Sequence, residues 1–153
     1  MESLERIIAE HPFFAELDDS FTNLMVSCAS NVRFQAGTYI LKEGDAANTF
    51  FLIRQGKVAL ELFAPHHKPI IVSTISVGEI LGWSWLLEPF QWKFNARAVD
   101  DVRAIALDGK CLRNKCEENH DLGYEVLKRF ARIMEQRLDA TRLQLLDVYA
   151  VRR

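Results

Sequence analysis

The chain has 153 residues, of which 19 are basic and 21 are acidic, giving a formal net charge of −2. A chain of this length can bury about 70% of its unfolded surface in one core, so we expect a single domain over residues 1–153. The balanced charge lacks the positive field that is typical of nucleic-acid-binding proteins, and DNA is not an expected partner. No apolar run approaches the ~18 residues of a membrane span, so we also expect no membrane association.

Three cysteines, Cys28, Cys111 and Cys116, form no C-x-x-C pair and leave an odd thiol. This arrangement fits a reducing compartment better than a disulfide framework. The sequence therefore predicts three free thiols and a cytoplasmic protein.

Apolar residues at helical intervals predict a helical cap over residues 1–31. Asp19 or Ser20 is well placed to cap its second main helix. Phe13 and Phe14 precede that helix, and we interpret the pair as anchors that attach the cap to the core.

Residues 32–108 show short β-branched and aromatic runs that are separated by turn residues such as Gly37, Gly44, Gly56 and Gly78. Turns at intervals of about 8 to 12 residues are typical of an antiparallel sandwich or barrel rather than of βαβ units. The sequence predicts a mainly β fold with helices, in which a jelly roll (double-stranded β-helix) carries the N-terminal cap.

From residue 109 to residue 153 the apolar period is helical again. We expect a short helix over residues 111–118 and a long one from a cap at Asp121 to about Tyr149. The long helix carries an apolar heptad seam of seven residues: Leu127, Ala131, Met134, Leu138, Thr141, Leu145 and Val148.

A helix of about 29 residues is roughly 43 Å long, which is more than one small β domain can cover. We therefore predict a parallel homodimer through this seam. The alternative is that the whole seam packs on its own barrel. Phe130 and Ile133 lie off the seam, and we interpret them as the residues that face the barrel.

The stretch of residues 78–97 interrupts the strands and contains all three tryptophans of the chain, Trp83, Trp85 and Trp92. We expect a tight turn at Gly82 that is followed by one short helical turn over residues 84–87. Free backbone N–H groups at the start of a helix favour anions. This stretch is therefore the candidate ligand site.

The order of these elements resembles that of the cyclic nucleotide-binding domain, as found in catabolite-activator transcription factors and in cyclic-nucleotide-regulated kinases and channels. The matching phrases are HPFFAELDD, VRFQAGTYILKEGDAANTFFLIRQGKVAL, VGEILG and DDVRAIALD, and the resemblance extends over nearly the whole chain. It implies a sensory module with a jelly-roll core and a long C-terminal dimerisation helix. The ligand class that it implies is a cyclic nucleotide.

In that family a Gly-Glu pair opens the phosphate-binding cassette, the Glu binds the ribose, and an Arg some ten residues later binds the cyclic phosphate. Here Gly82 matches the Gly, but Trp83 stands at the Glu position. Lys93 or Trp92 stands at the Arg position, depending on the direction of counting. Each lost charged contact costs on the order of 2 to 4 kcal/mol, which argues against ordinary recognition of cAMP or cGMP.

The candidate ligand-binding residues are Gly82, Trp83, Ser84, Trp92, Lys93, Arg97 and Thr141. Lys93 and Arg97 offer positive charge to an anion. Thr141 matches the helix position that contacts the purine in the catabolite-activator branch, or else it is a small polar residue of the helix seam. The tryptophans can stack on a small planar anionic ligand, or they can fill the pocket with their own rings.

Two functions remain open. The chain is either a dimeric small-molecule sensor or a ligand-free dimeric module that joins an effector protein. We expect no enzyme, because the polar residues form no Ser/His/Asp, Cys/His or paired-carboxylate set. His66 and His67 lack further metal ligands nearby. The sequence ends about where the family's winged helix would begin, so we expect no DNA-binding domain.

Overall fold

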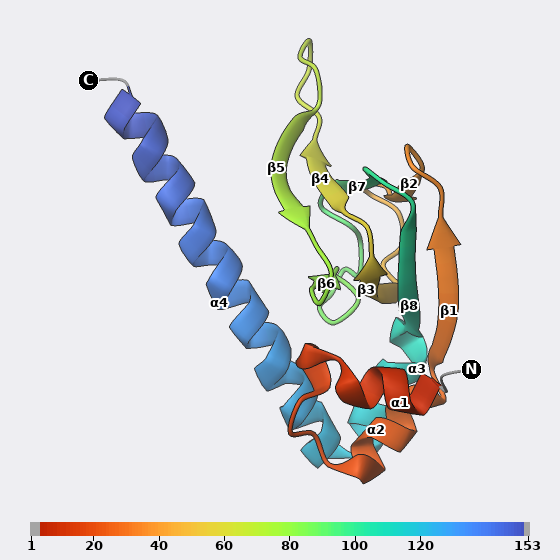
Figure 1. The fold of residues 1–153 in the computed structure, drawn as a ribbon. Helices are drawn as coiled ribbons and strands as arrows, with labels where there is room; N and C mark the ends of the chain where they lie inside the picture. Colours follow the sequence, from red (N-terminus) through yellow and green to blue (C-terminus); the bar gives the residue numbers. More distant parts are fainter. Residues whose placement is uncertain (1–3, 152–153) are drawn as a thin grey trace.

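The computed structural model describes residues 4–151 of the chain and contains two β-sheets, an N-terminal group of helices and two C-terminal helices (Figure 1). The elements follow in the order α1 (Leu4–Glu10), the 3-10 helix η1 (Pro12–Phe14), α2 (Asp19–Val26), β1 (Ala29–Phe34), β2 (Tyr39–Leu41), β3 (Thr49–Gln55), β4 (Val58–Leu62), β5 (Ile70–Ile75), β6 (Ile80–Leu81), β7 (Asn95–Ala98), β8 (Val102–Asp108), α3 (Gly109–Glu118) and α4 (His120–Val151).

The strands form two four-stranded sheets of order β1-β8-β3-β6 and β2-β7-β4-β5, with antiparallel pairing throughout. Side chains alternate between the two faces of a strand, so Ala96 and Ala98 of β7 enter the core while Arg97 does not. This architecture confirms the predicted jelly roll with its helical cap and long C-terminal helix. The β region begins at Ala29, slightly before the predicted boundary, because Ala29 already pairs with Leu107 of β8.

The two predicted anchor phenylalanines attach the cap to the core. Phe14 is buried, and the Phe13 ring packs edge-on against Phe130 of α4 with 5.0 Å between centroids. Arg129 of α4 adds polar contacts, since it donates hydrogen bonds to the backbone oxygens of Phe13 at 2.9 Å and of Ala15 at 2.8 Å. The base of α4 is thereby joined to the cap.

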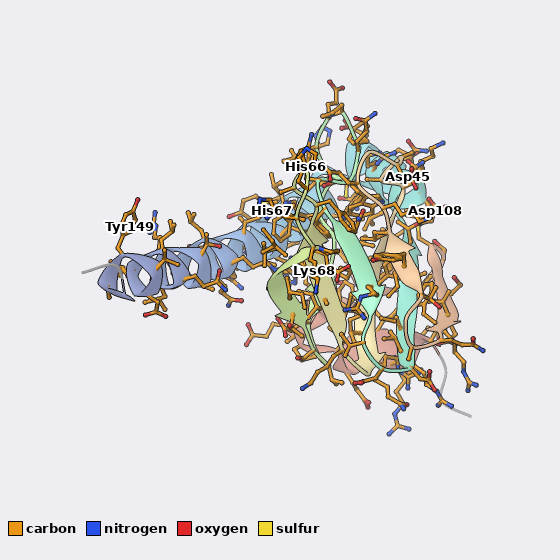
Figure 2. All side chains as sticks on the ribbon, turned by 90° about the horizontal axis from the view of Figure 1, so that it is seen from above. Asp45, His66, His67, Lys68, Asp108 and Tyr149 are labelled. Atoms are coloured by element: carbon orange, nitrogen blue, oxygen red, sulfur yellow. A yellow bond between two sulfur atoms is a disulfide. The ribbon has the colours of Figure 1, made fainter. Side chains whose placement is uncertain are left out.

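The long helix faces the β core with the residues that were expected to do so. Phe130 is completely buried and Ile133 packs against the core at partial exposure. Beyond residue 140 every described side chain of α4 is exposed, and Figure 2 shows Tyr149 well clear of the sandwich. No helix within residues 4–151 is both long and apolar enough to cross a bilayer.

The helix caps differ from the predicted ones by one or two residues. Asp18 caps α2 in place of Asp19 or Ser20, because its backbone is extended (φ −58°, ψ 138°) and its carboxylate accepts the Ser20 N–H at 2.8 Å. Asn119 caps α4 in place of Asp121 and accepts the Leu122 N–H at 3.1 Å. In both cases the cap is the last residue before the helix.

Cys28 and Cys111 form a disulfide with their Cα atoms 5.8 Å apart, so the prediction of three free thiols is wrong. The two residues are 83 positions apart in sequence, but β1 pairs with β8, and β8 leads directly into α3. Cysteine spacing along the chain contains no information on this proximity. Cys116 is free, and burial raises the pKa of its thiol to about 11. The cytoplasmic location rested on free thiols and stays a prediction.

The disulfide should contribute strongly to the stability of the fold. Closing a loop of 83 residues removes unfolded-state entropy worth about 4.5 kcal/mol at 25 °C in the chain-entropy model. We therefore expect reduction to lower the free energy of unfolding by up to about that amount. Urea denaturation with and without dithiothreitol measures it, and intact mass verifies the loss of the bond.

Cys116→Ser is the control for this experiment, since it removes the free thiol and keeps the bridge. It should respond to dithiothreitol in the same way as the wild type. Superimposable urea curves for oxidised and reduced wild-type protein would contradict the argument.

Candidate functional site

We call residues 82–94, which connect β6 to β7, the cassette. This segment forms an irregular turn. The Leu86 N–H donates to the Trp83 carbonyl at 3.0 Å, which closes one turn, and no helix follows over residues 84–87. The expected short helix is therefore a single hydrogen-bonded turn and offers no helix N-terminus to an anion. The backbone is irregular here because the side chains of Trp83 and Trp85 pack against different neighbours, and these contacts determine the path of the chain.

Trp85 is a core residue. Its completely buried ring stacks on Phe50 of β3 at 4.8 Å and meets Phe130 of α4 edge-on at 5.3 Å. The Trp85 carbonyl accepts a hydrogen bond from Arg113 of α3, whose guanidinium also lies 4.1 Å from the Phe90 ring centroid. Arg113 holds the cassette on α3, and sequence reasoning missed this residue.

Trp92 fills the space above Gly82. Its ring is 3% exposed, and a Cβ atom added at Gly82 would lie only 2.5 Å from it. Backbone hydrogen bonds hold Trp92 at both ends: its N–H donates to Asp45 at 3.0 Å, and its carbonyl accepts from Gly44 at 2.9 Å. Gly82 has φ 95°, a conformation that favours glycine. Glycine is needed here because the backbone has a positive φ and because the Trp92 ring leaves no room for a Cβ atom.

Trp83 faces the long helix. The guanidinium of Arg137 in α4 lies over its ring at 4.6 Å from the centroid and also donates to the Ile80 carbonyl. Burial lowers the pKa of Arg137 to about 10, and the charge of Glu79 opposes that shift. The Nη1 atom of Arg137 is buried without a hydrogen-bond partner in the described part of the chain. The sequence did not identify Arg137 as a site residue, although Arg137 precedes the candidate residue Thr141 by one helical turn.

The remaining candidate residues have other surroundings. Arg97 lies on the outer face of the second sheet, where its Nε donates to Glu61 at 3.2 Å. The Thr141 hydroxyl is exposed and donates to the Arg137 carbonyl at 2.8 Å. Lys93 is exposed, and Ser84 is half-buried beside Trp83. The structure thus brings together Gly82, Trp83 and Trp92, while the hydrogen bonds of Arg97 and Thr141 lead elsewhere.

The ion pair of Arg97 has a buried partner. Glu61 is only 4% exposed, and the β4 strand places it on the same outer face as Arg97. Burial raises the pKa of the neighbouring Tyr39 hydroxyl, and the negative charge of Glu61 adds to that shift. The strict alternation of Ala96, Arg97 and Ala98 is the sequence signal that could have assigned this outward orientation.

A groove of about 670 Å³ runs beside the cassette, between α4 and the sandwich. Its lining includes the hydroxyls of Ser73 and Thr74, the guanidinium groups of Arg132 and Arg137, and the carboxylate of Glu79. Two cations with hydroxyl donors can hold a small anion. Within residues 4–151 no three His, Cys, Asp or Glu side chains are grouped to hold a metal, and His66 and His67 are exposed in the β4–β5 loop (Figure 2).

The contact between Gly82 and Trp92 gives a measurable prediction. Gly37→Ala should cost about 1 to 2 kcal/mol, because φ is 89° there but nothing lies within 4 Å of the new Cβ atom. Gly82→Ala has the same backbone penalty and an overpacking penalty of about 1 to 3 kcal/mol more. Urea denaturation of both variants measures the difference. Equal costs for the two variants would mean that the Trp92 ring moves aside freely.

Three comparisons with known proteins agree with this fold. A profile of the cyclic nucleotide-binding domain matches residues 31–119, more than half of the chain. The crystal structure of a putative cyclic nucleotide-binding protein from Geobacter metallireducens is similar with a TM-score of 0.79 and 30% identity, over 90% of this chain and 99% of that one. The catabolite activator protein of Thermus thermophilus has the same fold, with a TM-score of 0.70 and 23% identity over 91% of this chain and 63% of that one.

Among curated proteins, the CRP-like cAMP-activated global transcriptional regulator of Mycobacterium tuberculosis is 21% identical over 145 residues. The match covers 95% of this chain and 63% of that regulator, so the chain spans somewhat less than two thirds of the relative's length. The profile match and the Geobacter structure together establish the relationship. The chain belongs to the cyclic nucleotide-binding domain family.

Proposed function

We propose that the chain is a non-catalytic, homodimeric regulatory module of the cyclic nucleotide-binding fold whose cassette is closed by its own tryptophans. The observation that carries the proposal is the buried Trp92 ring on Gly82. A cyclic nucleotide in the family's cassette would have to displace this ring, and it would find neither the glutamate nor the arginine that the family uses.

The energetic balance supports a closed cassette. Exposing a buried tryptophan ring costs about 3 to 5 kcal/mol, by analogy with deletion of a large core side chain. A ligand must make up this cost in addition to the missing charged contacts. At 1.4 kcal/mol for each factor of ten in affinity, displacement alone weakens binding by at least about a hundredfold.

The proposed homodimer uses the apolar seam of α4. Leu138 is 52% exposed and Leu145 is 53% exposed. Phe130 and Ile133 occupy the face toward the barrel. Met134 of the seam also packs partly against the core, whereas Leu127 and Val148 are exposed like Leu138 and Leu145. Apolar residues at heptad spacing on an exposed helix are typical of a two-stranded coiled coil. A second copy of the chain would cover the seam along its length.

The contact between Arg137 and Trp83 links the cassette to the dimer helix. Arg137 belongs to α4, while Trp83 immediately follows Gly82 in the cassette. A change in the cassette therefore alters the support of α4 just before its exposed half. We infer that an effector protein reads the position of the paired helices.

A second candidate function is a sensor for a small planar anion. The observations that favour it are the groove beside α4 and the unpartnered, buried Nη1 atom of Arg137. A phosphate or carboxylate that enters from the groove could pair with Arg137 and Arg132 and loosen the stack on Trp83. The ligand would then act on α4 without entering the family's cassette.

Substitution of the seam tests the dimer. Leu138→Glu with Leu145→Glu places four like charges at the interface of two copies, so we expect a monomer in sedimentation equilibrium where the wild type is a dimer. Leu143→Glu with Leu146→Glu is the matched control, since both leucines are more than 60% exposed but lie off the seam. A control pair that also dissociates, or a seam pair that does not, would contradict the assignment of the interface.

A ligand titration tests the closed cassette. A ligand at a hundred times its dissociation constant stabilises a folded protein by about 2.7 kcal/mol. We expect cAMP, cGMP and cyclic dinucleotides at millimolar concentration to give no saturable shift of the melting temperature and no quenching of tryptophan fluorescence.

Arg137→Ala distinguishes the two candidate functions in the same assay. A saturable shift in the wild type that disappears in this variant would overturn the closed module in favour of the groove sensor. A saturable shift that survives in Arg137→Ala but is lost in Trp92→Ala would mean that the cassette itself opens.

A further inference from the structure

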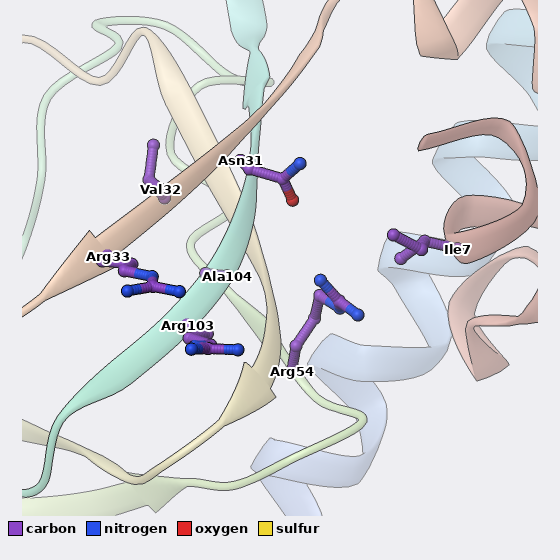
Figure 3. Close-up of a pocket in the computed structure, with 7 residues that line it drawn as sticks. All are labelled: Ile7, Asn31, Val32, Arg33, Arg54, Arg103 and Ala104. Carbon is purple, nitrogen blue, oxygen red and sulfur yellow. The ribbon is translucent and has the colours of Figure 1, made fainter. Parts of the chain in front are cut away.

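A second concentration of positive charge lies on the outer face of the first sheet. Arg33 of β1, Arg54 of β3 and Arg103 of β8 line one depression of about 500 Å³ (Figure 3). Arg33 and Arg103 are direct cross-strand partners in the β1–β8 pair. We call these three residues the arginine cluster.

Strand geometry explains why three arginines meet here. Arg103 shares a face of β8 with Ile105 and Leu107, which are completely buried. Ile7 of α1 lines the depression, so the cluster begins where the helical cap ends. In β3 a bulge falls between Ile53 and Gln55, and the extra residue is Arg54. Bulges commonly redirect a side chain in this way.

Within the described residues, no carboxylate compensates the charges of Arg33 and Arg103. Like charges directly opposite each other on neighbouring strands are destabilising. Arg33 and Arg103 nevertheless make no ion pair and no side-chain hydrogen bond with the described part of the chain. The other described lining residues are apolar or neutral: Ile7, Asn31, Val32 and Ala104. In a chain of net charge −2, this local excess of cations points to an anionic partner.

We propose that the arginine cluster binds an acidic segment of a partner protein in an extended conformation. Guanidinium groups pair with carboxylates through two parallel hydrogen bonds, and such clusters are a recurring way to recognise acidic motifs. Alternate residues of an extended chain point to one side about 6.7 Å apart, while neighbouring strands are about 4.8 Å apart. A strand added beside β1 therefore places one acidic side chain directly next to Arg33 and further acidic side chains on the same face, while Arg103 lies one strand farther across that face.

The position of β1 favours an extended segment over a compact ion. β1 is the terminal strand of its sheet, so no described strand pairs with its outer edge, and Asn31 adds an amide beside Arg33. An incoming strand could add to this edge with its acidic side chains over the depression. A single small anion would be exposed on an open surface, and three cations are few for a nucleic acid, whose affinity grows with the number of phosphates neutralised.

The test uses a fluorescein-labelled synthetic peptide of eight residues in which glutamate and threonine alternate. We expect saturable binding to the wild-type protein by fluorescence anisotropy at low salt, and at least tenfold weaker binding to the double variant Arg33→Gln/Arg103→Gln. The matched control is Lys68→Gln/Arg142→Gln, which removes the same charge from exposed positions elsewhere and should change affinity less than twofold. Circular dichroism verifies that all proteins are folded.

Charge reversal provides a second arm. Arg33→Glu/Arg103→Glu should lose the acidic peptide and gain binding of the same peptide with lysine in place of glutamate. No saturable binding of the acidic peptide to the wild type, or equal loss in the matched control, would overturn the proposal. So would tighter binding of tripolyphosphate or of a single-stranded oligonucleotide at Arg33 and Arg103 than of the peptide. Since none of these measurements involves the cassette or the α4 seam, their failure is distinct from a failure of the proposed function.

Discussion

The stack of Phe50 on Trp85, closed by the edge of Phe130, is the contact on which the rest of the structure depends. These three rings come from the first sheet, the cassette and α4. Each aromatic pair contributes about 0.5 to 1.5 kcal/mol beyond its burial, and all three side chains are completely buried. The stack fixes which face of α4 is turned inward. With Phe130 in the core, Leu127, Leu138 and Leu145 of the heptad seam stay exposed, while Met134 packs partly against the core.

The same constraint explains the shape of the cassette. With Trp85 anchored in the core, Trp83 and Trp92 have different neighbours. Trp83 then meets Arg137 of α4, and Trp92 covers Gly82. In the proposed closed cassette, the indoles occupy the segment in which the family resemblance implies a ligand. Trp85 joins this segment to the sandwich, and Trp83 joins it to α4.

Much of this architecture could be predicted from periodicity. The change from period two to helical spacing located the sheets and α4, and the offset of Phe130 and Ile133 from the seam identified the inward face. The disulfide between Cys28 and Cys111 could not be predicted, because it depends on strand pairing across 83 residues. The arginine cluster was missed for the same reason. In the cassette, the expected helical turn over residues 84–87 is only a single hydrogen-bonded turn, because the tertiary contacts of the indoles determine the backbone.

The helix α4 is held unevenly along its length, and this bears on how a signal could pass through it. Its base is fixed by the buried Phe130 and by Arg129, whose guanidinium bonds to two carbonyls of the cap and to Glu125. Farther along, the contacts to the sandwich include the Arg137–Trp83 stack, the hydrogen bond from Arg137 to the Ile80 carbonyl, and a long hydrogen bond of 3.4 Å from Gln144 to β5. A cation–π contact contributes about 0.5 to 2 kcal/mol. The burial of each leucine side chain in a coiled-coil seam contributes about 1.5 to 3 kcal/mol, so several seam leucines together would outweigh this contact. In the proposed homodimer, the partner helix that covers the seam would therefore set the direction of the distal half, while the base keeps the orientation that the aromatic stack imposes.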